Sequence, residues 1–401
     1  MKTPRLYWDD PLLLDFASQV IDRTELDGRP ALVLRETAFC PEAGGQLADR
    51  GEASWDGGAA RVVDAQEDDE GRVLHVLETS DPLPPPGTAI RIRIDAGRRR
   101  AHMSQHTGQH MLSRALLDVA GAPTVSSRLG ETICTIDVTA EQLTDEQLAD
   151  AETLVAKVVL EDRPVRAFVP TPEELATLPL RRDPKVSRDV RIIDVEGFDL
   201  SPCGGTHVQR TGQVGALRIL GTERYKGGTR ITFATGLRAL RDAARKDRIL
   251  RELSAGLTCG IDELPQVIAR MQADRRDEHK AAAALRERLA RYVGDELLAK
   301  AASKDGVRWV VATLPDEPIE SLRAIGARIA ETPDAVAILA SPAAAATRIL
   351  VHSGVQSGVG AGALLQRIAQ AAGGRGGGRP DRAEGQIPAG VDLAAIWSSL
   401  G

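Results

Sequence analysis

The stretch RRRAHMSQHTGQHMLSRAL, residues 98–116, carries three of the seven histidines of this 401-residue chain, spaced four residues apart. Residues four apart lie on one face of an α-helix. Apolar residues toward the end of the stretch recur with the helical period, so the sequence predicts a helix over residues 103–121. A helix here would present either His102 with His106, or His106 with His110, to a single metal ion.

A second concentration of metal-binding residue types lies in GFDLSPCGGTHV, residues 197–208, where Cys203 and His207 are again four apart. The glycines between them predict a tight turn rather than a helix. Two nitrogens from one element, with a sulfur and a nitrogen from another, make a mixed tetrahedral set that suits zinc. Each pair alone is a weak signal, but both together in a chain with seven His and four Cys predict one Zn²⁺ per chain.

The other histidines and cysteines are scattered along the chain. The isolated histidines, expected to be structural or solvent-facing, are His75, His279 and His352. The cysteines expected to be small core residues are Cys40, Cys134 and Cys259. Because the cysteine spacing fits no disulfide framework, a reducing, cytoplasmic setting is expected.

The overall composition narrows the class of partner. The net charge of -6 argues against a generally basic nucleic-acid-binding surface, although Arg98–Arg100 forms a local basic patch. Aromatic residues make up only 3%, so nucleic-acid contact is not expected to depend on rows of stacked rings. The N-terminus MKTPRLYWDD lacks a signal-peptide pattern and no apolar run is long enough to span a bilayer, so no membrane partner is expected.

The order of elements predicts an α+β multidomain fold. Its four segments are a β-barrel-like N-terminal domain with a Gly-rich loop (1–95), an α+β domain with the zinc centre (96–236), a helical or coiled-coil arm (237–303) and a small C-terminal α/β domain (304–401). The strands predicted in the first segment are 29–39, 59–66, 72–78 and 88–95.

The motifs resemble a known family. HTGQHML at 106–112 followed by SPCGGTHV at 201–208 resembles the editing domain shared by alanyl- and threonyl-tRNA synthetases. TAFCPEAGGQLADRG at 37–51 resembles the glycine-rich loop beside that domain in alanyl-type members, and GGRGGGRPDRAEG at 373–385 resembles the glycine-rich end of their DHHA1-type C-terminal domain. Because only 95 residues precede the editing segment, the chain is expected to be a freestanding alanyl-tRNA editing protein of the long AlaX type.

The resemblance implies a reaction and a set of ligands. Such proteins hydrolyse, without ATP, the ester that joins serine or glycine to tRNA(Ala). The family pattern places the metal ligands on His106, His110, Cys203 and His207, and leaves His102 outside the set, with a role on the RNA side beside Arg98–Arg100. The chain departs from the pattern at Cys40, where the family has Tyr, and at Ala43, where it has Gly.

A separate editing site answers a physical problem. A pocket built for alanine rejects glycine poorly because a methyl group is worth only about 1–3 kcal/mol, and it cannot strongly reject a side chain that merely adds a hydroxyl. A second site that hydrogen-bonds the hydroxyl would reverse the selection, since alanine would leave its polar groups unpaired.

Several further residues are candidates for this site. The candidates for catalysis or for reading the serine hydroxyl are Gln109, Thr124, Ser126, Ser127 and Asp199, the last as a group that orients a metal ligand. The candidates for contact with tRNA are Gly44, Gly45 and Gln46 at the terminal adenosine, and Arg98, Arg375, Arg379 and Arg382 at phosphates. Zinc would either activate water through an open position or, with four protein ligands, order the pocket.

Three other functions compete with this interpretation. A zincin-type hydrolase is disfavoured because Thr107 replaces the glutamate of its His-Glu-x-x-His motif. A non-catalytic, zinc-stabilised tRNA-binding module and a threonyl-type editing hydrolase both remain open. The expected partners are mischarged tRNA(Ala) and a second copy of the chain, bound through the C-terminal region.

Overall fold

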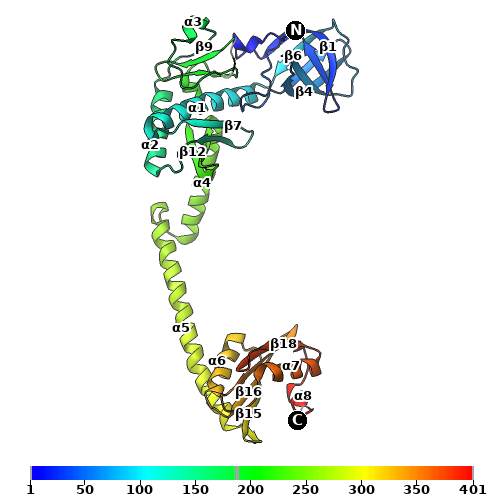
Figure 1. Cartoon of the computed structure of the whole chain (residues 1–401), viewed down its shortest axis with the longest axis vertical. Helices are drawn as coiled ribbons and strands as arrows, with labels where there is room; N and C mark the ends of the chain where they lie inside the picture. The colour runs from blue at the N-terminus through cyan, green and yellow to red at the C-terminus, as the bar shows by residue number, and fades with distance from the viewer. Residues whose placement is uncertain (1, 185, 187–188, 400–401) are drawn as a thin grey trace. The chain divides into compact units, whose positions relative to one another are not determined.

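The structure is a computed structural model that describes residues 2–184, 186 and 189–399. The chain divides into two compact units, Met1–Glu252 and Leu253–Gly401 (Figure 1). Together they form the mixed α+β, multidomain architecture that the sequence predicts.

A closed antiparallel barrel forms the start of the first unit, after the short 3-10 helix η1 (Leu6–Trp8). In order around the barrel its strands are β1 (Asp15–Leu26), β2 (Arg29–Leu34), β5 (Val73–Glu78), β4 (Gly58–Glu67), β3 (Gly51–Trp55) and β6 (Ala89–Ile94). Strand β6 alternates strictly, with Ile90, Ile92 and Ile94 buried and the arginines between them exposed. The predicted barrel is confirmed, and the sequence missed strands β1 and β3.

Helix α1 (Ala96–Ala120) follows β6 directly and carries the first histidine cluster. The side chain of Asp95 caps the helix by accepting the backbone N–H of Arg98, and Gly121 ends it at a left-handed φ of 59°. The helix begins seven residues before the predicted start at 103, because Asp95 and not a later residue is its cap. Every residue from His102 to Ser113 is buried, so each polar side chain on this segment needs a partner inside the protein.

Two antiparallel sheets and a second helix pack around α1. The four-stranded sheet has the order β12 (Leu217–Tyr225), β13 (Gly228–Thr235), β8 (Cys134–Val138) and β7 (Thr124–Leu129). The three-stranded sheet has the order β11 (Asp199–Pro202), β10 (Ile192–Val195) and β9 (Val165–Phe168). The helices here are α2 (Asp145–Leu160), the short α3 (Pro172–Leu175) and the 3-10 helix η2 (Thr211–Val214). One shared apolar core, which includes Leu112, Val155 and Phe233, holds α1 against α2, β8 and β13.

Helix α4 (Gly236–Leu257) runs across the boundary between the two units. The second unit begins with η3 (Ile261–Glu263) and the long helix α5 (Leu264–Ala299). Its six-stranded sheet has the order β14 (Ala302–Lys304), β15 (Val307–Thr313), β16 (Ala335–Pro342), β17 (Ala346–Ser353), β19 (Arg382–Pro388) and β18 (Arg375–Gly378). The remaining helices are α6 (Ile319–Ala330), α7 (Ala361–Ala372) and α8 (Leu393–Ser399).

The glycine-rich segment 373–385 forms an edge hairpin of this sheet. A Cβ on Gly376 would lie 2.8 Å from the Cα of Gly385 and 2.9 Å from Leu365 of α7. The glycines therefore allow the two strands and α7 to pack closely. None of the helices in the described ranges is both long and apolar enough to cross a membrane.

Candidate metal centre

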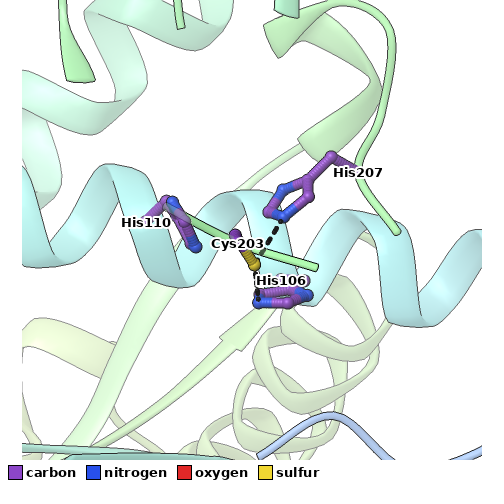
Figure 2. A group of neighbouring side chains, drawn as sticks. All are labelled: His106, His110, Cys203 and His207. Atoms are coloured by element: carbon purple, nitrogen blue, oxygen red, sulfur yellow. Dashed lines mark hydrogen bonds between the residues drawn. The ribbon is translucent and has the colours of Figure 1, made fainter. Parts of the chain in front are cut away.

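Four side chains from α1 and from the turn after β11 converge on one point. The ligand-type atoms of His106, His110, Cys203 and His207 all lie within 4.8 Å of one another. The Sγ of Cys203 lies 3.3 Å from the Nε2 of His106 and 3.3 Å from the Nε2 of His207 (Figure 2). His106 and His110 project from the same face of α1, so of the two histidine pairs that spacing left open, the structure assembles this one.

Each of the three imidazoles has a polar group beside its Nδ1 atom. The Nδ1 of His106 lies 2.7 Å from the Oε1 of Gln46, and the Nδ1 of His207 lies 3.1 Å from the Oγ1 of Thr107. For His110 the neighbour is Asp199, whose Oδ2 is 3.4 Å from Nδ1. An oxygen beside Nδ1 favours the tautomer that leaves Nε2 free as a metal ligand.

A buried, unpaired nitrogen atom supports a metal ion at these residues independently of their spacing. The Nε2 of His110 is buried and has no hydrogen-bond partner among the described residues. An unpaired buried polar atom is costly. An ion bound between the three imidazoles and the Cys203 sulfur would remove that cost.

The charges around the cluster favour an ionised sulfur. Burial alone would raise the pKa of the Cys203 thiol, but the adjacent His106 and His207 lower it well below its usual value. Burial opposes the protonation of His110, whereas Asp199 and Cys203 raise its pKa. Although burial would raise the pKa of Asp199, His110 and Arg181 lower it, so this carboxylate stays ionised beside the cluster.

Gly205 explains why the turn between the second pair of ligands is glycine-rich. A Cβ at this position would lie 2.4 Å from the Cε1 of His106 and 2.8 Å from the Oε1 of Gln46. The backbone of the turn therefore passes so close to the imidazole that only glycine fits. Gly204 has open space around it, with no heavy atom within 4 Å of its hypothetical Cβ.

The glycine-rich loop of the barrel supports the cluster from the other side. Gly44 and Gly45 have left-handed φ values of 61° and 90°, and a Cβ on Gly45 would lie 2.5 Å from the carbonyl oxygen of Ser127. Ala43, the departure from the family pattern, is not among the residues with positive φ, so its methyl group causes no backbone strain. The loop thus packs on β7 and extends Gln46 to His106.

A buried ion pair fixes this loop relative to α1. Asp49 and Arg99 are fully buried, and the Nη2 of Arg99 lies 2.7 Å from the Oδ2 of Asp49. Arg99 also donates to the carbonyls of Pro11 and Ala38, and Asp49 accepts the N–H of Cys40. Because both charges are satisfied by several hydrogen bonds, removing either partner would be strongly destabilising.

A cavity of about 600 Å³ opens beside the cluster. Its wall includes the ligands His106 and Cys203, and also Thr124, Ser126 and Ser127 of β7. Gly44 and Gly45 line it, whereas Gln46 is fully buried. The prediction that Gln46 contacts a substrate adenosine is therefore wrong: its side-chain amide bonds His106 and Thr206 instead.

The hydroxyl of Thr124 is held in one orientation by a short chain of hydrogen bonds. Gln109 donates to the Oγ of Ser113 at 2.8 Å, and the Oγ1 of Thr124 donates to the same atom at 2.8 Å. Gln109 is buried and does not line the cavity, so it acts on this wall only through Ser113. Since its proton points to Ser113, the oxygen of Thr124 keeps its lone pairs free to accept a hydrogen bond, and Thr124 is one of the residues that line the cavity.

The other predicted site residues lie as follows. Ser126 is exposed at the cavity rim and donates to the Oδ2 of Asp137 at 2.5 Å. The Oδ2 of Asp199 lies 3.4 Å from the Nδ1 of His110, and its Oδ1 accepts from Arg181 at 2.6 Å. Arg98 donates to Glu131 and to the carbonyl of Ala48, so its guanidinium is used within the protein. Arg375, Arg379 and Arg382 are exposed on the edge hairpin of the second unit.

The structure corrects the expected RNA-facing role of His102 and Arg99 and the expected core position of Cys259. His102 is 2% exposed and Arg99 is fully buried against Asp49, so neither offers an RNA-facing surface with Arg98. Burial, with the nearby Arg98, lowers the pKa of His102 to about 4 and keeps it neutral. Cys259 is only half-buried in the turn after α4 and is not a core residue, whereas Cys40 and Cys134 are buried.

Sequence reasoning missed three residues of the site. Thr107 accepts the N–H of Val208 and contacts His207. Its position in sequence between the ligands His106 and His110 could have indicated a role in the site. Arg191 and Trp8 line the cavity from segments that carry no recognisable motif. Their place follows only from the pairing of β10 with β11 and from the hydrogen bond of Trp8 to Gly204.

Comparisons with known proteins find similarity to the same group of proteins that the motifs resemble. The family described as "Threonyl and Alanyl tRNA synthetase second additional domain" matches residues 190–232, which include Arg191, Cys203 and His207. The family described as "tRNA synthetases class II (A)" matches residues 14–98. The first ligand pair, His106 and His110, lies between these two matched segments.

Similar curated proteins extend this likeness to almost the whole chain. The chain is 32% identical over 391 residues to the alanine–tRNA ligase of Ignicoccus hospitalis, and 33% identical over 398 residues to that of Methanothrix thermoacetophila. These alignments cover 95% and 96% of this chain, but only 41% and 43% of the ligases. The chain is thus related in sequence to alanine–tRNA ligases and spans less than half of their length.

One solved structure overlaps part of the chain. It is the C-Ala domain of alanyl-tRNA synthetase from Aquifex aeolicus, at 18% sequence identity and a TM-score of 0.24. The overlap covers 25% of this chain and 93% of that structure, and it is too weak to define a fold.

Proposed function

We propose that the protein is a zinc-dependent aminoacyl-tRNA deacylase that removes serine, and also glycine, from mischarged tRNA(Ala) without ATP. The observation that carries the proposal is the position of the ligand cluster. His106 and Cys203 form part of the wall of a cavity that Thr124 also lines. The relation to alanine–tRNA ligases and the matched second additional domain support tRNA(Ala) as the substrate.

Zinc fits the donor set best. Three imidazole nitrogens and a thiolate make a tetrahedral, partly soft site, which suits zinc better than calcium or magnesium. The residues that would hold it are His106, His110, Cys203 and His207. When bound by these four ligands, the ion would order the wall of the cavity, and it would supply Lewis-acid polarisation to the ester only through an additional, fifth coordination position.

The residues of the chain would select the substrate. A seryl group in the cavity could donate its hydroxyl proton to the Oγ1 of Thr124, whose own proton is held by Ser113. The methyl group of alanine would cover this oxygen without pairing with it, which costs about 1–3 kcal/mol, whereas glycine would leave space for a water molecule that can donate to it. The ester itself would lie on the side of the cavity formed by His106 and Cys203.

The experiment that tests the proposal compares the deacylation of Ser-tRNA(Ala), Gly-tRNA(Ala) and Ala-tRNA(Ala) by the zinc-loaded protein and by Cys203→Ala. We expect rapid loss of serine, slower loss of glycine and little loss of alanine, with no activity in the variant. A protein that binds the tRNA but hydrolyses none of the three would be a non-catalytic module. Full activity of metal-free protein would refute the role of zinc.

The substrate specificity has its own test. Thr124→Val keeps the shape of the side chain but removes the acceptor oxygen. We expect the preference for serine over alanine to fall about ten-fold, while the hydrolysis of glycine changes little. Hydrolysis of Ser-tRNA(Thr) in preference to Ser-tRNA(Ala) would instead indicate a threonyl-type editor.

We propose that the substrate is mischarged tRNA that has already been released from the enzyme that charged it. The same assay tests this point, because the tRNA is charged and purified before the protein is added. We also propose that the chain forms a homodimer through the C-terminal region.

A further inference from the structure

Arg191 is a buried cation that the ligand cluster does not use. It directly precedes β10 and is only 5% exposed. Its Nη1 donates to the carbonyls of Cys203 and Gly205 at 3.2 and 2.8 Å, and its own carbonyl accepts the N–H of Cys203 at 2.9 Å. The guanidinium therefore lies directly against the turn that carries the sulfur ligand.

Arg191 differs from the other buried arginines near the cluster. Arg99 is paired with Asp49 and Arg181 is paired with Asp199. Within the described ranges of the chain, no carboxylate lies within ion-pair distance of Arg191, and its side-chain hydrogen bonds there go only to backbone carbonyls. The ionised sulfur of Cys203 is the main opposite charge near Arg191, but a bound metal ion would share that sulfur, so an anion in the cavity would further stabilise this buried cation.

The unused edge of this guanidinium faces the cavity. Arg191 lines the cavity together with His106 and Cys203. Its Nε and Nη2 donate no hydrogen bond to a described residue, yet they are not among the unpaired atoms that are sealed from solvent. These two atoms form one edge of a planar fork, which matches two oxygens of a phosphate group.

Neighbouring side chains hold this arginine in place and determine the electrostatic potential of the cavity. The guanidinium carbon lies 5.8 Å from the centre of the Trp8 ring, and the Nε1 of Trp8 donates to the carbonyl of Gly204 at 3.2 Å. Lys2 and Arg182 also line the cavity. Of the three carboxylates among the described residues of the cavity, Glu67 is paired with Arg5, Asp183 and Asp189 are exposed, and none is paired with Arg191.

We propose that the Nε–Nη2 edge of Arg191 binds the phosphodiester that joins the last two nucleotides of the tRNA. This inference rests on the proposed function. The amino acid is esterified to the terminal ribose, so this linkage is the charged group of the RNA nearest to the ester. Arg191, packed against the Cys203 turn, would hold the terminal nucleotide at a fixed distance from the metal ligands, and it is a positioning residue.

The proposal is tested by measuring RNA binding instead of ester hydrolysis. The probe is an uncharged RNA minihelix with the acceptor stem and single-stranded 3′ end of tRNA(Ala), made with either a phosphodiester or a neutral methylphosphonate at the last linkage. Both probes are titrated against the full-length wild type, Arg191→Met, Arg191→Lys and the matched control Arg182→Met. Arg182 lines the same cavity and donates to the carbonyl of Pro202, but it is exposed.

We expect the methylphosphonate to weaken binding to the wild type and to Arg182→Met about ten-fold, since a charge-assisted contact is lost. Arg191→Met should bind both probes equally weakly, and Arg191→Lys should recover part of the difference, because lysine supplies charge without the fork. The metal content of each variant, measured in parallel, separates loss of the contact from collapse of the Cys203 turn.

Two outcomes would overturn the inference. One is a wild type that binds both probes with equal affinity, a result that does not depend on any variant folding correctly. The other is an Arg191→Met protein that binds as the wild type does but has a lower kcat, which would indicate stabilisation of the reacting ester instead. The probes carry no amino acid, so the binding result can be interpreted even if the protein fails to deacylate tRNA. Likewise, the deacylation result can be interpreted even if Arg191 makes no phosphate contact.

Discussion

Gly205 and Gly204 are adjacent in sequence but differ in the space around them. We expect Gly205→Ala to displace the imidazole of His106 and to lower metal affinity by about 10- to 100-fold, the range seen when a group that orients a ligand is lost. Gly204→Ala is the matched control, because its methyl group would enter open space. Titration with a competing chelator measures both affinities. Equal affinities would show that the turn tolerates a side chain at either position.

How much of the site the sequence could predict is clearest for the individual ligands. His102, His106 and His110 are equally spaced, so helical geometry alone could not choose between the two pairs. The choice depends on the position of the Cys203 turn, which β11 brings to the side of α1 that carries His106 and His110. Gln46 and Thr107 complete the site through contacts that span up to 160 residues, and no local pattern encodes such contacts.

Among the elements, the barrel strand β5 contains a histidine whose protonation opposes folding. His75 is fully buried, with its Nδ1 3.0 Å from the carbonyl of Leu32 and its Nε2 2.8 Å from the hydroxyl of Thr37. Burial lowers its pKa from 6.5 to about 4. Between these values the unfolded chain binds a proton that the folded barrel does not, so stability is complete above pH 6.5 and falls as the pH decreases.

We therefore expect His75 to reduce the free energy of unfolding by up to about 3 kcal/mol as the pH falls from 6.5 to 4. Urea unfolding followed by tryptophan fluorescence measures this change. His75→Gln should lose less stability than the wild type over the same range, although its stability at neutral pH will be lower. Parallel curves for the two proteins would mean that His75 does not titrate in this way.

Helix α5 carries an exposed apolar stripe that suggests how a dimer would form. Leu285, Leu289 and Tyr292 are 62%, 56% and 72% exposed, on the face opposite Ala290 and Gly294, which are buried. The same heptad register runs back through Glu278 and Arg275 to Met271 and Ile268. In an antiparallel pair centred between residues 276 and 277, Ile268 would face Leu285 of the second copy, and Arg275 would face its Glu278.

This register makes a charge-reversal prediction. Arg275→Glu alone and Glu278→Arg alone should each weaken the dimer about ten-fold by placing like charges opposite each other, and the double variant should restore it. Arg276→Glu, which changes the same charge on the other side of the helix, is the control. Sedimentation equilibrium gives the dissociation constants. Failure of the double variant to recover the dimer would exclude this register.

The elements themselves were predicted unevenly. Strands with strong alternation, such as β6 with its three isoleucines, were found within one or two residues of their bounds. Strands β1 and β3 were missed because solvent-facing polar residues dominate β1 and because β3 has only five residues. Helix α1 was found because the apolar residues Met111, Leu112, Ala115 and Leu116 recur with the helical period, although its histidine face is buried as well.

For the whole molecule, the ligand cluster lies entirely in one of the two units. All four ligands lie within Met1–Glu252, and no residue of the second unit is among them. Metal bound only by the folded state stabilises it by about 4 kcal/mol at a thousand-fold excess over the dissociation constant. Chelation should therefore increase hydrogen exchange in α1 and β11 and leave β16 and β17 unchanged. Mass spectrometry of the full chain resolves these segments, and an effect of equal size in β16 would contradict the prediction.

Length and composition indicated several domains, but they could not show that contacts group the chain into two units. The division at Glu252 and Leu253 falls within α4, where the sequence is continuously helical. A helical pattern does not reveal which domain each turn contacts, because it records only the local period of the apolar residues. The partition follows from tertiary contacts alone.

The distance along the chain between the two halves of the ligand cluster has a consequence for biosynthesis. His106 and Cys203 are separated by 97 residues, and the intervening segment includes α2, β9 and β10. On the ribosome, the imidazoles of α1 would be complete long before the sulfur that joins them is made. A nascent chain could not hold the ion in its final coordination until His207 had left the exit tunnel, so the metal content of newly made protein would report how many chains have joined these distant segments.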